Sequence, residues 1–270
     1  MPTGMTLFFH FYAFAIGTLI GSFLNVVIHR VPREVSIVFP ASRCPSCGHK
    51  IRPWDNVPVL AWLWLGGRCR DCRAPIAARY PLVELANGLF YVAIFQRTGI
   101  SFTSLCLAAI VSMTIALIFI DLDFQLLPDV LTYPAIVIAL VMGWIATDQR
   151  GDRMLLADSL LESAAGAVIG AGVLLAISLS YLLIRRIEGM GAGDTKMLAY
   201  IGAVTGWKGL FPLMLIASIT GSVVGVLVAM RSEKGMQVAV PFGVFLGMAF
   251  LVVIFFGPTL SSWYVALLLR

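Results

Sequence analysis

Two acidic motifs stand out in a chain where charged side chains are scarce. Asp121 follows an apolar stretch and begins the segment DLDFQLLPD, which ends at Asp129. Asp194 lies in the segment GMGAGDTK, just before another apolar stretch. Two carboxyl groups held close together share one proton, because ionising both is costly. Such a pair can hydrolyse a peptide bond: the ionised group activates water and the protonated group polarises the carbonyl. Asp121 and Asp194 are therefore candidates for a catalytic pair.

Simpler interpretations of these acids remain open. Carboxylates at a membrane boundary are often helix caps or solvated loop charges, and Asp129 suits the N-cap of a helix after Pro128. Asp123 fits either a solvated charge or a substrate contact. The glycines before Asp194 permit tight backbone, which is tolerated at the membrane edge where it lines a wet cavity. Four further residues are candidates for substrate binding: Asp123, Asp129, Glu188 and Lys196.

Four of the five cysteines form two CxxC pairs with 21 residues between them: Cys44, Cys47, Cys69 and Cys72. Two such pairs suit tetrahedral thiolate coordination of a structural zinc ion, with no position left for catalytic water. Disulfides and unligated thiols are the alternatives, and a reducing cytoplasm disfavours the disulfides. His49 is a minor ligand candidate. Cys106 lies in an apolar stretch and is expected to be a small buried hydrophobe.

The elements that position these groups are predicted to be membrane helices. Hydrophobic residues make up 60% of the 270 residues and charged ones 12%, with a mean hydropathy of +0.94. We expect an all-α polytopic membrane protein with about eight transmembrane helices. The first, in residues 1–29, is too long for a cleaved signal peptide, and its Gly17 and Gly21 favour close helix packing. The expected helices are Met5–Ile28, Pro81–Phe95, Phe102–Ile120, Val130–Ala146, Ala164–Ile184, Met197–Val204, Leu210–Met230 and Val240–Phe256.

The distribution of basic residues predicts the topology. With the N-terminus outside and the segment 197–204 crossing the membrane, fourteen of the nineteen lysines and arginines face the cytoplasm, as the positive-inside rule requires. The cysteine loop, residues 30–80, and both aspartates then lie on the cytoplasmic side. The segment 197–204 is short, and whether it crosses is open; crossing keeps Arg231 and Lys234 inside. The net charge of +5 thus reflects loops beside membrane lipid rather than nucleic-acid binding.

Together the motifs resemble the type IV prepilin peptidases, which are bifunctional leader peptidases and N-methyltransferases. The resemblance covers nearly the whole chain. Its motifs, in order, are GSFLNVVIHRVP from Gly21, the two CxxC pairs, the Asp121 segment with LPD, GAGDTK at 191–196 and PFG at 241–243.

The resemblance implies a catalytic role for Asp121 and Asp194 in a peptidase domain over residues 81–270. It implies that a zinc-binding, methyltransferase-associated domain covers residues 30–80, and that the enzyme lies in the bacterial inner membrane. Prepilins or pseudopilins would lose a basic leader after a glycine, and S-adenosylmethionine would methylate the new N-terminus. Asp123, Asp129 and Glu188 would attract the leader. The resemblance does not place the methyl-donor site, for which Asn25, Glu84 and the loop at residues 30–80 are considered.

Two other classes of protein remain to be weighed. Broken helices and buried acids also mark ion-coupled membrane transporters, although here the acids cluster at one face rather than at the midplane. A zinc-binding membrane scaffold without catalysis would explain the cysteines but not the two aspartate motifs.

Overall fold

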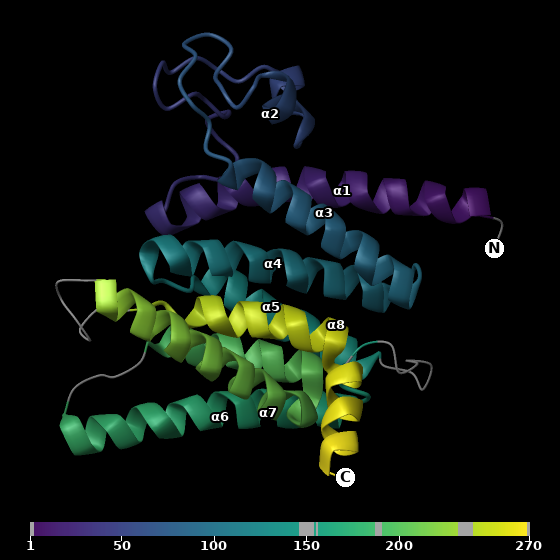
Figure 1. The fold of residues 1–270 in the computed structure, drawn as a ribbon, viewed down its shortest axis with the longest axis vertical. Coiled ribbons are helices and arrows are strands. Elements are labelled where there is room, and N and C mark those ends of the chain that lie inside the picture. Colours follow the sequence, from purple (N-terminus) through teal and green to yellow (C-terminus); the bar gives the residue numbers. More distant parts are fainter. Residues whose placement is uncertain (1–2, 146–153, 155, 187–190, 232–239, 269–270) are drawn as a thin grey trace. The chain divides into compact units, whose positions relative to one another are not determined.

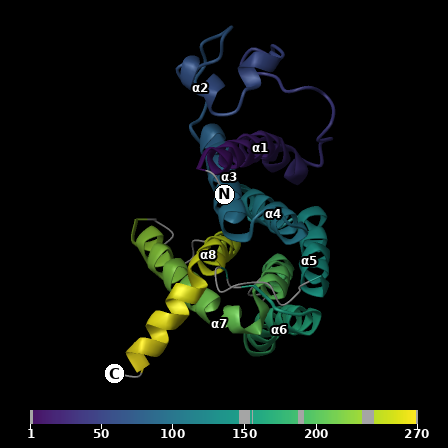
Figure 2. The same cartoon turned by 90° about the vertical axis from the view of Figure 1, so that its right-hand side faces the viewer.

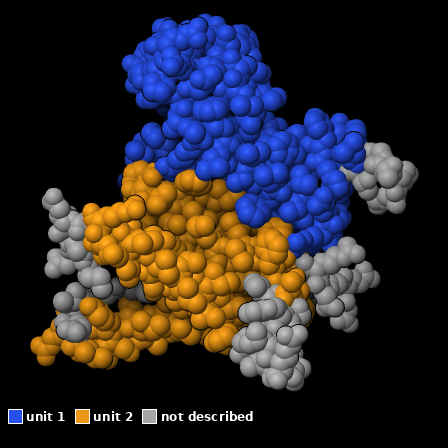
Figure 3. Space-filling view, in the orientation of Figure 1, with its two compact units in different colours: residues 1–104 blue, residues 105–270 orange. Residues whose placement is uncertain are grey.

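The computed structural model describes residues 3–145, 154, 156–186, 191–231 and 240–268, and the regular elements there are helices (Figure 1). The long ones are α1 (Thr3–Arg30), α3 (Arg79–Thr98), α4 (Phe102–Phe124), α5 (Asp129–Trp144), α6 (Leu160–Arg185), α7 (Ala192–Arg231) and α8 (Phe242–Leu268). The short ones are α2 (Leu60–Trp64) and two 3₁₀ turns, Val31–Arg33 and Pro53–Asn56. The chain forms two compact units, residues 1–104 and 105–270 (Figure 3).

The all-helical membrane fold is confirmed. Five segments of the described chain are long and apolar enough to cross a membrane: Leu7–Arg33, Phe102–Phe124, Leu160–Ile184, Ala192–Arg231 and Phe242–Thr259. The sixteen-residue α5 is shorter. Asp129 is the first residue of α5 and Pro128 is its N-cap, so the N-cap expected at Asp129 lies one residue earlier.

The sixth and seventh predicted helices form one element, α7, which breaks at Gly206 with φ 67° and ψ 176°. The first half runs parallel to α8, since Met197 lies beside Gly247 and Tyr200 beside Phe250. The second half runs the opposite way, since Gly221 lies beside Phe245 and Gly225 beside Val240. The element is therefore a helical hairpin that packs on α8 with both halves (Figure 2).

The segment before α6 stabilises the turn of this hairpin. The N–H of Ala157 donates to the carbonyl of Val204 at 2.8 Å, which satisfies a group that the break would leave without its helical partner. Glu162 lies against Gly206 and forms an ion pair of 3.1 Å with Lys208. Residues 146–153 and 155 of the linker lie outside the described residues, but its end is a packed part of the fold.

Small residues let α6 and the first half of α7 approach to backbone contact. A Cβ added at Gly166 would lie 2.0 Å from the carbonyl oxygen of Gly202, and one at Gly170 would lie 2.6 Å from that of Leu198. Beside them the buried hydroxyl of Ser163 donates to the carbonyl of Ala203 at 2.7 Å. Close approach of this kind supplies dispersion energy that lipid cannot match.

In residues 1–104, α1 and α3 pack in the same way. Gly17 lies against Gly88, and Gly21 lies against the backbone of Glu84. The buried Asn87 amide donates to the carbonyl of Gly17 at 2.7 Å. The helix-packing interpretation of Gly17 and Gly21 is thereby confirmed.

Candidate active site and cysteine cluster

Asp121 lies in the last turn of α4 and is buried, with 5% of its surface exposed. Its Oδ2 accepts a hydrogen bond of 3.0 Å from the N–H of Val244, in the first turn of α8. A Cβ at Gly243 would lie 2.8 Å from the same oxygen. Glycine there lets the N-terminus of α8, where N–H groups lack helical partners, approach the carboxylate.

Asp194 lies in the first turn of α7 and is half-buried. It is close enough to Asp121 for the two carboxyl groups to interact electrostatically. The two motifs also share a contact: Leu127, which follows α4, lies 2.9 Å from the Cβ position of Gly193 and 3.1 Å from that of Gly243. The structure therefore brings together two acids that are 73 positions apart in the sequence.

A buried polar contact fixes the same helices deeper in the unit. The hydroxyl groups of Thr114 on α4 and Tyr200 on α7 lie 3.1 Å apart, and Tyr200 is fully buried. The Tyr200 ring meets Phe250 of α8 edge to face, with centroids 6.2 Å apart. Sequence reasoning missed these residues, although a tyrosine and a threonine inside apolar helices are the signal that could have found them.

The candidate substrate residues differ in their contacts. Lys196 and Asp129 form an ion pair of 2.5 Å, and Lys196 also lies 5.1 Å from the centre of the Tyr133 ring. This pair ties the start of α7 to the start of α5. Asp123 is exposed in the last turn of α4, and Glu188 lies outside the described residues.

The four paired cysteines come together in the cysteine loop. Their sulfur atoms all lie within 4.8 Å of one another, and the Sγ atoms of Cys44 and Cys72 are 3.8 Å apart. A tetrahedral site with metal–sulfur bonds of about 2.3 Å has sulfur atoms about 3.8 Å apart, so the arrangement fits a metal ion. His49 is not part of the cluster, and Cys106 is buried as expected.

The two CxxC turns repeat one local structure, which sequence reasoning missed. The N–H of Cys44 donates to His49 and that of Gly48 to Cys44; in the second turn, Cys69 donates to Ala74 and Arg73 to Cys69. Gly48 and Arg73 occupy equivalent positions, with φ of 71° and 60°. N–H groups of Cys47 and Ser46 lower the pKa of the Cys44 thiol to about 6, which favours the thiolate form.

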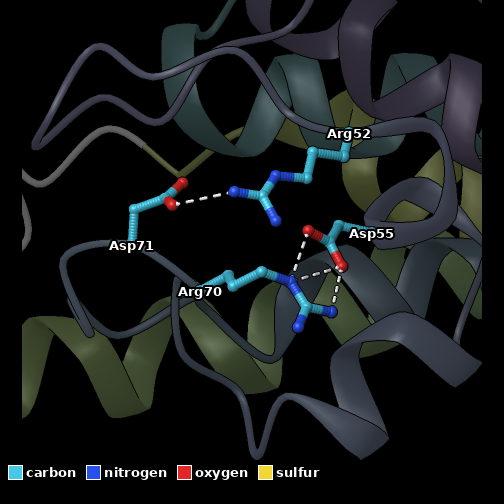
Figure 4. A network of polar contacts seen from close by, with 4 residues as sticks. All are labelled: Arg52, Asp55, Arg70 and Asp71. Carbon is cyan, nitrogen blue, oxygen red and sulfur yellow. Dashed lines mark hydrogen bonds and ion pairs between the residues drawn. The ribbon is translucent and has the colours of Figure 1, made fainter.

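Ion pairs hold the second CxxC turn against the middle of the loop (Figure 4). Arg70 contacts both oxygens of Asp55, with bonds of 2.6–3.0 Å, and this guanidinium holds the pKa of Asp55 below its ordinary value. Arg52 lies 3.4 Å from Asp71. Bidentate pairing of this kind fixes orientation as well as distance.

The two residues considered for the methyl-donor site both contact the cysteine loop, Asn25 at its end and Glu84 near its middle. The Asn25 amide donates to the carbonyl of Tyr80 at 3.1 Å. The buried Glu84 carboxylate accepts a bond of 2.7 Å from the N–H of Val59, a valine with φ of 61°. These contacts join α1 and α3 to the cysteine loop.

Comparison with known proteins identifies the family to which this chain belongs. Residues 106–226, which include both aspartates, match the type IV leader peptidase family, and residues 15–98 match the bacterial peptidase A24 N-terminal domain. The chain belongs to the type IV leader peptidase family. It is therefore a multi-pass membrane enzyme of a peptidase family, and nothing in these matches supports a transporter.

Relatives match over most of their length. A prepilin leader peptidase/N-methyltransferase of Aeromonas hydrophila is 36% identical, with 93% of this chain and 92% of the relative covered. A protein of the same name from Burkholderia pseudomallei (strain 1026b) is 36% identical, with 95% of this chain and 87% of the relative covered. Another from Pseudomonas aeruginosa is 34% identical, with 92% of this chain and 91% of the relative covered. No solved structure matches the chain.

The ion pair between Asp129 and Lys196 gives a reciprocal test of how the two motifs are held. We expect D129K and K196D each to lower peptidase kcat/KM by roughly ten- to a hundredfold, because small displacements of catalytic groups are costly. The double variant restores the pair with its charges exchanged and should regain much of that loss. A double variant no better than the worse single one would show that the residues act separately.

Proposed function

We propose that this enzyme removes basic leaders from prepilins or pseudopilins, with Asp121 and Asp194 as its catalytic pair. The observation that carries the proposal is the proximity of these two carboxyl groups at the end of α4 and the start of α7, where Leu127 contacts both Gly193 and Gly243, in a chain of the leader peptidase family. The relatives named above are prepilin leader peptidases/N-methyltransferases, and their names supply the substrate class.

The mechanism follows from two carboxyl groups that share one proton. The ionised carboxylate takes a proton from a water molecule as that water attacks the scissile carbonyl carbon. The protonated carboxyl donates a hydrogen bond to the carbonyl oxygen, where negative charge develops. The resulting tetrahedral intermediate collapses when the leaving amine accepts a proton. The bond from Val244 to Asp121 keeps one carboxyl oriented throughout.

The leader is proposed to bind on the polar side of the pair. The topology with the N-terminus outside puts the site at the cytoplasmic face, where the charges of Asp123, Asp129 and Glu188 would attract basic side chains. Asp129 pairs with Lys196, and replacing it would also disturb that ion pair. Asp123 is exposed at the end of α4, so its charge is the one chosen for the test.

Zinc is the proposed ion of the cysteine cluster, because four thiolates in a tetrahedron are typical of structural zinc sites. Cys44, Cys47, Cys69 and Cys72 would hold it, leaving no open position for chemistry. The ion would join the two CxxC turns of the loop. Its role would be to stabilise the fold of residues 30–80, which we assign to the methyltransferase part of the enzyme.

Methylation of the new N-terminus is proposed as the second activity, with S-adenosylmethionine as the methyl donor. The names of the relatives support it. Asn25 and Glu84 are both engaged with backbone groups near the loop, so no residue is assigned to the methyl donor. In this scheme the free amine produced by cleavage is the nucleophile of the transfer.

Asparagine at either catalytic position tests the peptidase proposal. D121N and D194N should each abolish cleavage of a prepilin, because an amide cannot exchange a proton with water or the amine. Mass spectrometry of the pilin after incubation with enzyme and S-adenosylmethionine reports cleavage and methylation together. Both variants should still methylate a pilin that was cleaved beforehand, and full processing by either variant would contradict the proposal.

Metal analysis of the purified chain tests the zinc proposal. Wild-type protein should contain about one zinc ion per chain, and C47S should lose it because three thiolates bind far more weakly. The matched control is C106S, since Cys106 is buried and is not a member of the cluster. Retention of stoichiometric zinc by C47S would refute the assignment.

The charge on Asp123 tests leader binding. D123N should raise KM for a prepilin with a basic leader and leave kcat nearly unchanged, because the carboxylate would act on binding alone. The effect should shrink at high salt, which screens an exposed charge. An unchanged KM at low salt would exclude this role.

A further inference from the structure

A short apolar segment of the cysteine loop is used by neither of the proposed activities. Val35, Ile37, Val38 and Phe39 follow α1 within a few residues, and all four are exposed. Val38 and Phe39 leave 67% and 75% of their surfaces exposed. Large apolar side chains gathered on a surface mark a site of contact with a partner or a membrane. We call residues 35–39 the apolar tip.

Hydrogen bonds give the apolar tip a defined shape. The hydroxyl oxygen of Ser36 accepts bonds of 3.3 Å from the N–H groups of Val38 and Phe39. The N–H of Val35 donates to the carbonyl of Arg30 at 3.1 Å. These bonds satisfy backbone groups that would otherwise need water, so they reduce the cost of moving the tip into a less polar medium. A preformed tip also loses little conformational entropy when it makes a contact.

The Arg30 side chain ties both ends of the tip to α1. Its guanidinium, in the last turn of α1, donates to the carbonyl of Ser36 at 2.8 Å and to that of Pro40 at 2.7 Å. The tip therefore begins and ends at the last turn of α1. Most of α1 belongs to the segment Leu7–Arg33, which is long and apolar enough to cross a membrane. A membrane-spanning α1 thus places the tip at the boundary between lipid and water.

The charges around the tip suit an anionic membrane surface. Arg30, Arg33 and Arg43 flank the tip, and Glu34 is the one acidic residue in the sequence between positions 29 and 43. Three arginines and one glutamate leave a net charge of +2. Basic residues beside apolar side chains are typical of segments that bind at the interface of an anionic membrane. Because the tip is held at the end of α1, lipid is the partner that is always within its reach.

We propose that the apolar tip inserts into the interfacial layer of the membrane that α1 spans. Val38 and Phe39 would lie below the lipid headgroups, and the flanking arginines would lie at the level of the lipid phosphates. The insertion would give the cysteine loop a second attachment to the membrane, besides its covalent connections to α1 and α3. The inference depends on the membrane fold alone and on neither of the proposed activities.

A photoactivatable side chain at the tip tests this contact. Phe39→p-benzoylphenylalanine keeps an aromatic side chain, which light joins to whatever it touches. The full-length enzyme is illuminated in nanodiscs of phosphatidylethanolamine and phosphatidylglycerol, and peptide mass spectrometry identifies the adduct. We expect lipid adducts as the main product. The same group at Lys50, an exposed charged residue beside the first CxxC turn, should give roughly fivefold fewer, because a charged side chain favours water.

The charge of Arg33 gives a second variant. R33E, in the chain labelled at position 39, should lower the yield of lipid adduct about threefold in these anionic nanodiscs, because the surface repels the glutamate. In nanodiscs of neutral phosphatidylcholine the yield should stay the same. K50E is the matched reversal outside the tip and should leave the yield unchanged in both lipids. An unchanged yield for R33E in anionic nanodiscs would overturn the role given to the arginines.

Three results would overturn the insertion itself. Adducts with residues 105–270 would show that the rest of the chain covers the tip. Adducts with a second copy, visible as a cross-linked dimer, would make the tip a contact between two enzymes. Equal yields of lipid adduct at positions 39 and 50 would show that the label meets lipid without a defined site. None of these readouts requires cleavage or methylation, so a failure here is distinct from a failure of the peptidase proposal.

Discussion

The close approach of helix ends around two carboxyl groups is the constraint on which the rest of this structure depends. Asp121 has to lie near both Asp194 and the N-terminus of α8. A side chain at Gly243 would collide with the Asp121 carboxylate, and one at Gly193 would collide with Leu127, which lies between the two motifs. The hairpin of α7 makes this approach possible. After the break at Gly206, the second half of α7 runs back toward the end of the unit where α7 begins. The catalytic proposal therefore depends on backbone contacts that are made along the whole length of the unit.

Lipid surroundings explain how these contacts are secured. A helix in a membrane gains little from hydrophobic association, so small residues and satisfied polar groups hold the bundle together. Glycines of α6 and α7 provide the close contact, and Ser163 and Tyr200 add hydrogen bonds between helices.

Much of this architecture could be predicted because hydropathy and motif spacing are local signals. Apolar runs located the helices, the CxxC spacing predicted the cysteine cluster, and the scarcity of charge drew attention to Asp121 and Asp194. Relations between distant segments were missed. The sequence does not tell that the N–H of Val244 meets Asp121, that Lys196 pairs with Asp129, or that Ala157 satisfies Val204. The similarity of the two CxxC turns could not be predicted either, because it consists of equivalent hydrogen bonds and not of identical residues.

The convergence of the two acids can be measured without any assay of activity. Cysteines introduced together by D121C and D194C, in a chain that also carries C106S, can be treated with a short bifunctional thiol reagent in native membranes. Peptide mass spectrometry then identifies which cysteines are joined. The account predicts a cross-link within one chain between positions 121 and 194, and none between positions 121 and 158 in the matched D121C/D158C variant. A cross-link absent from the first pair, in protein that is otherwise folded, would contradict the account.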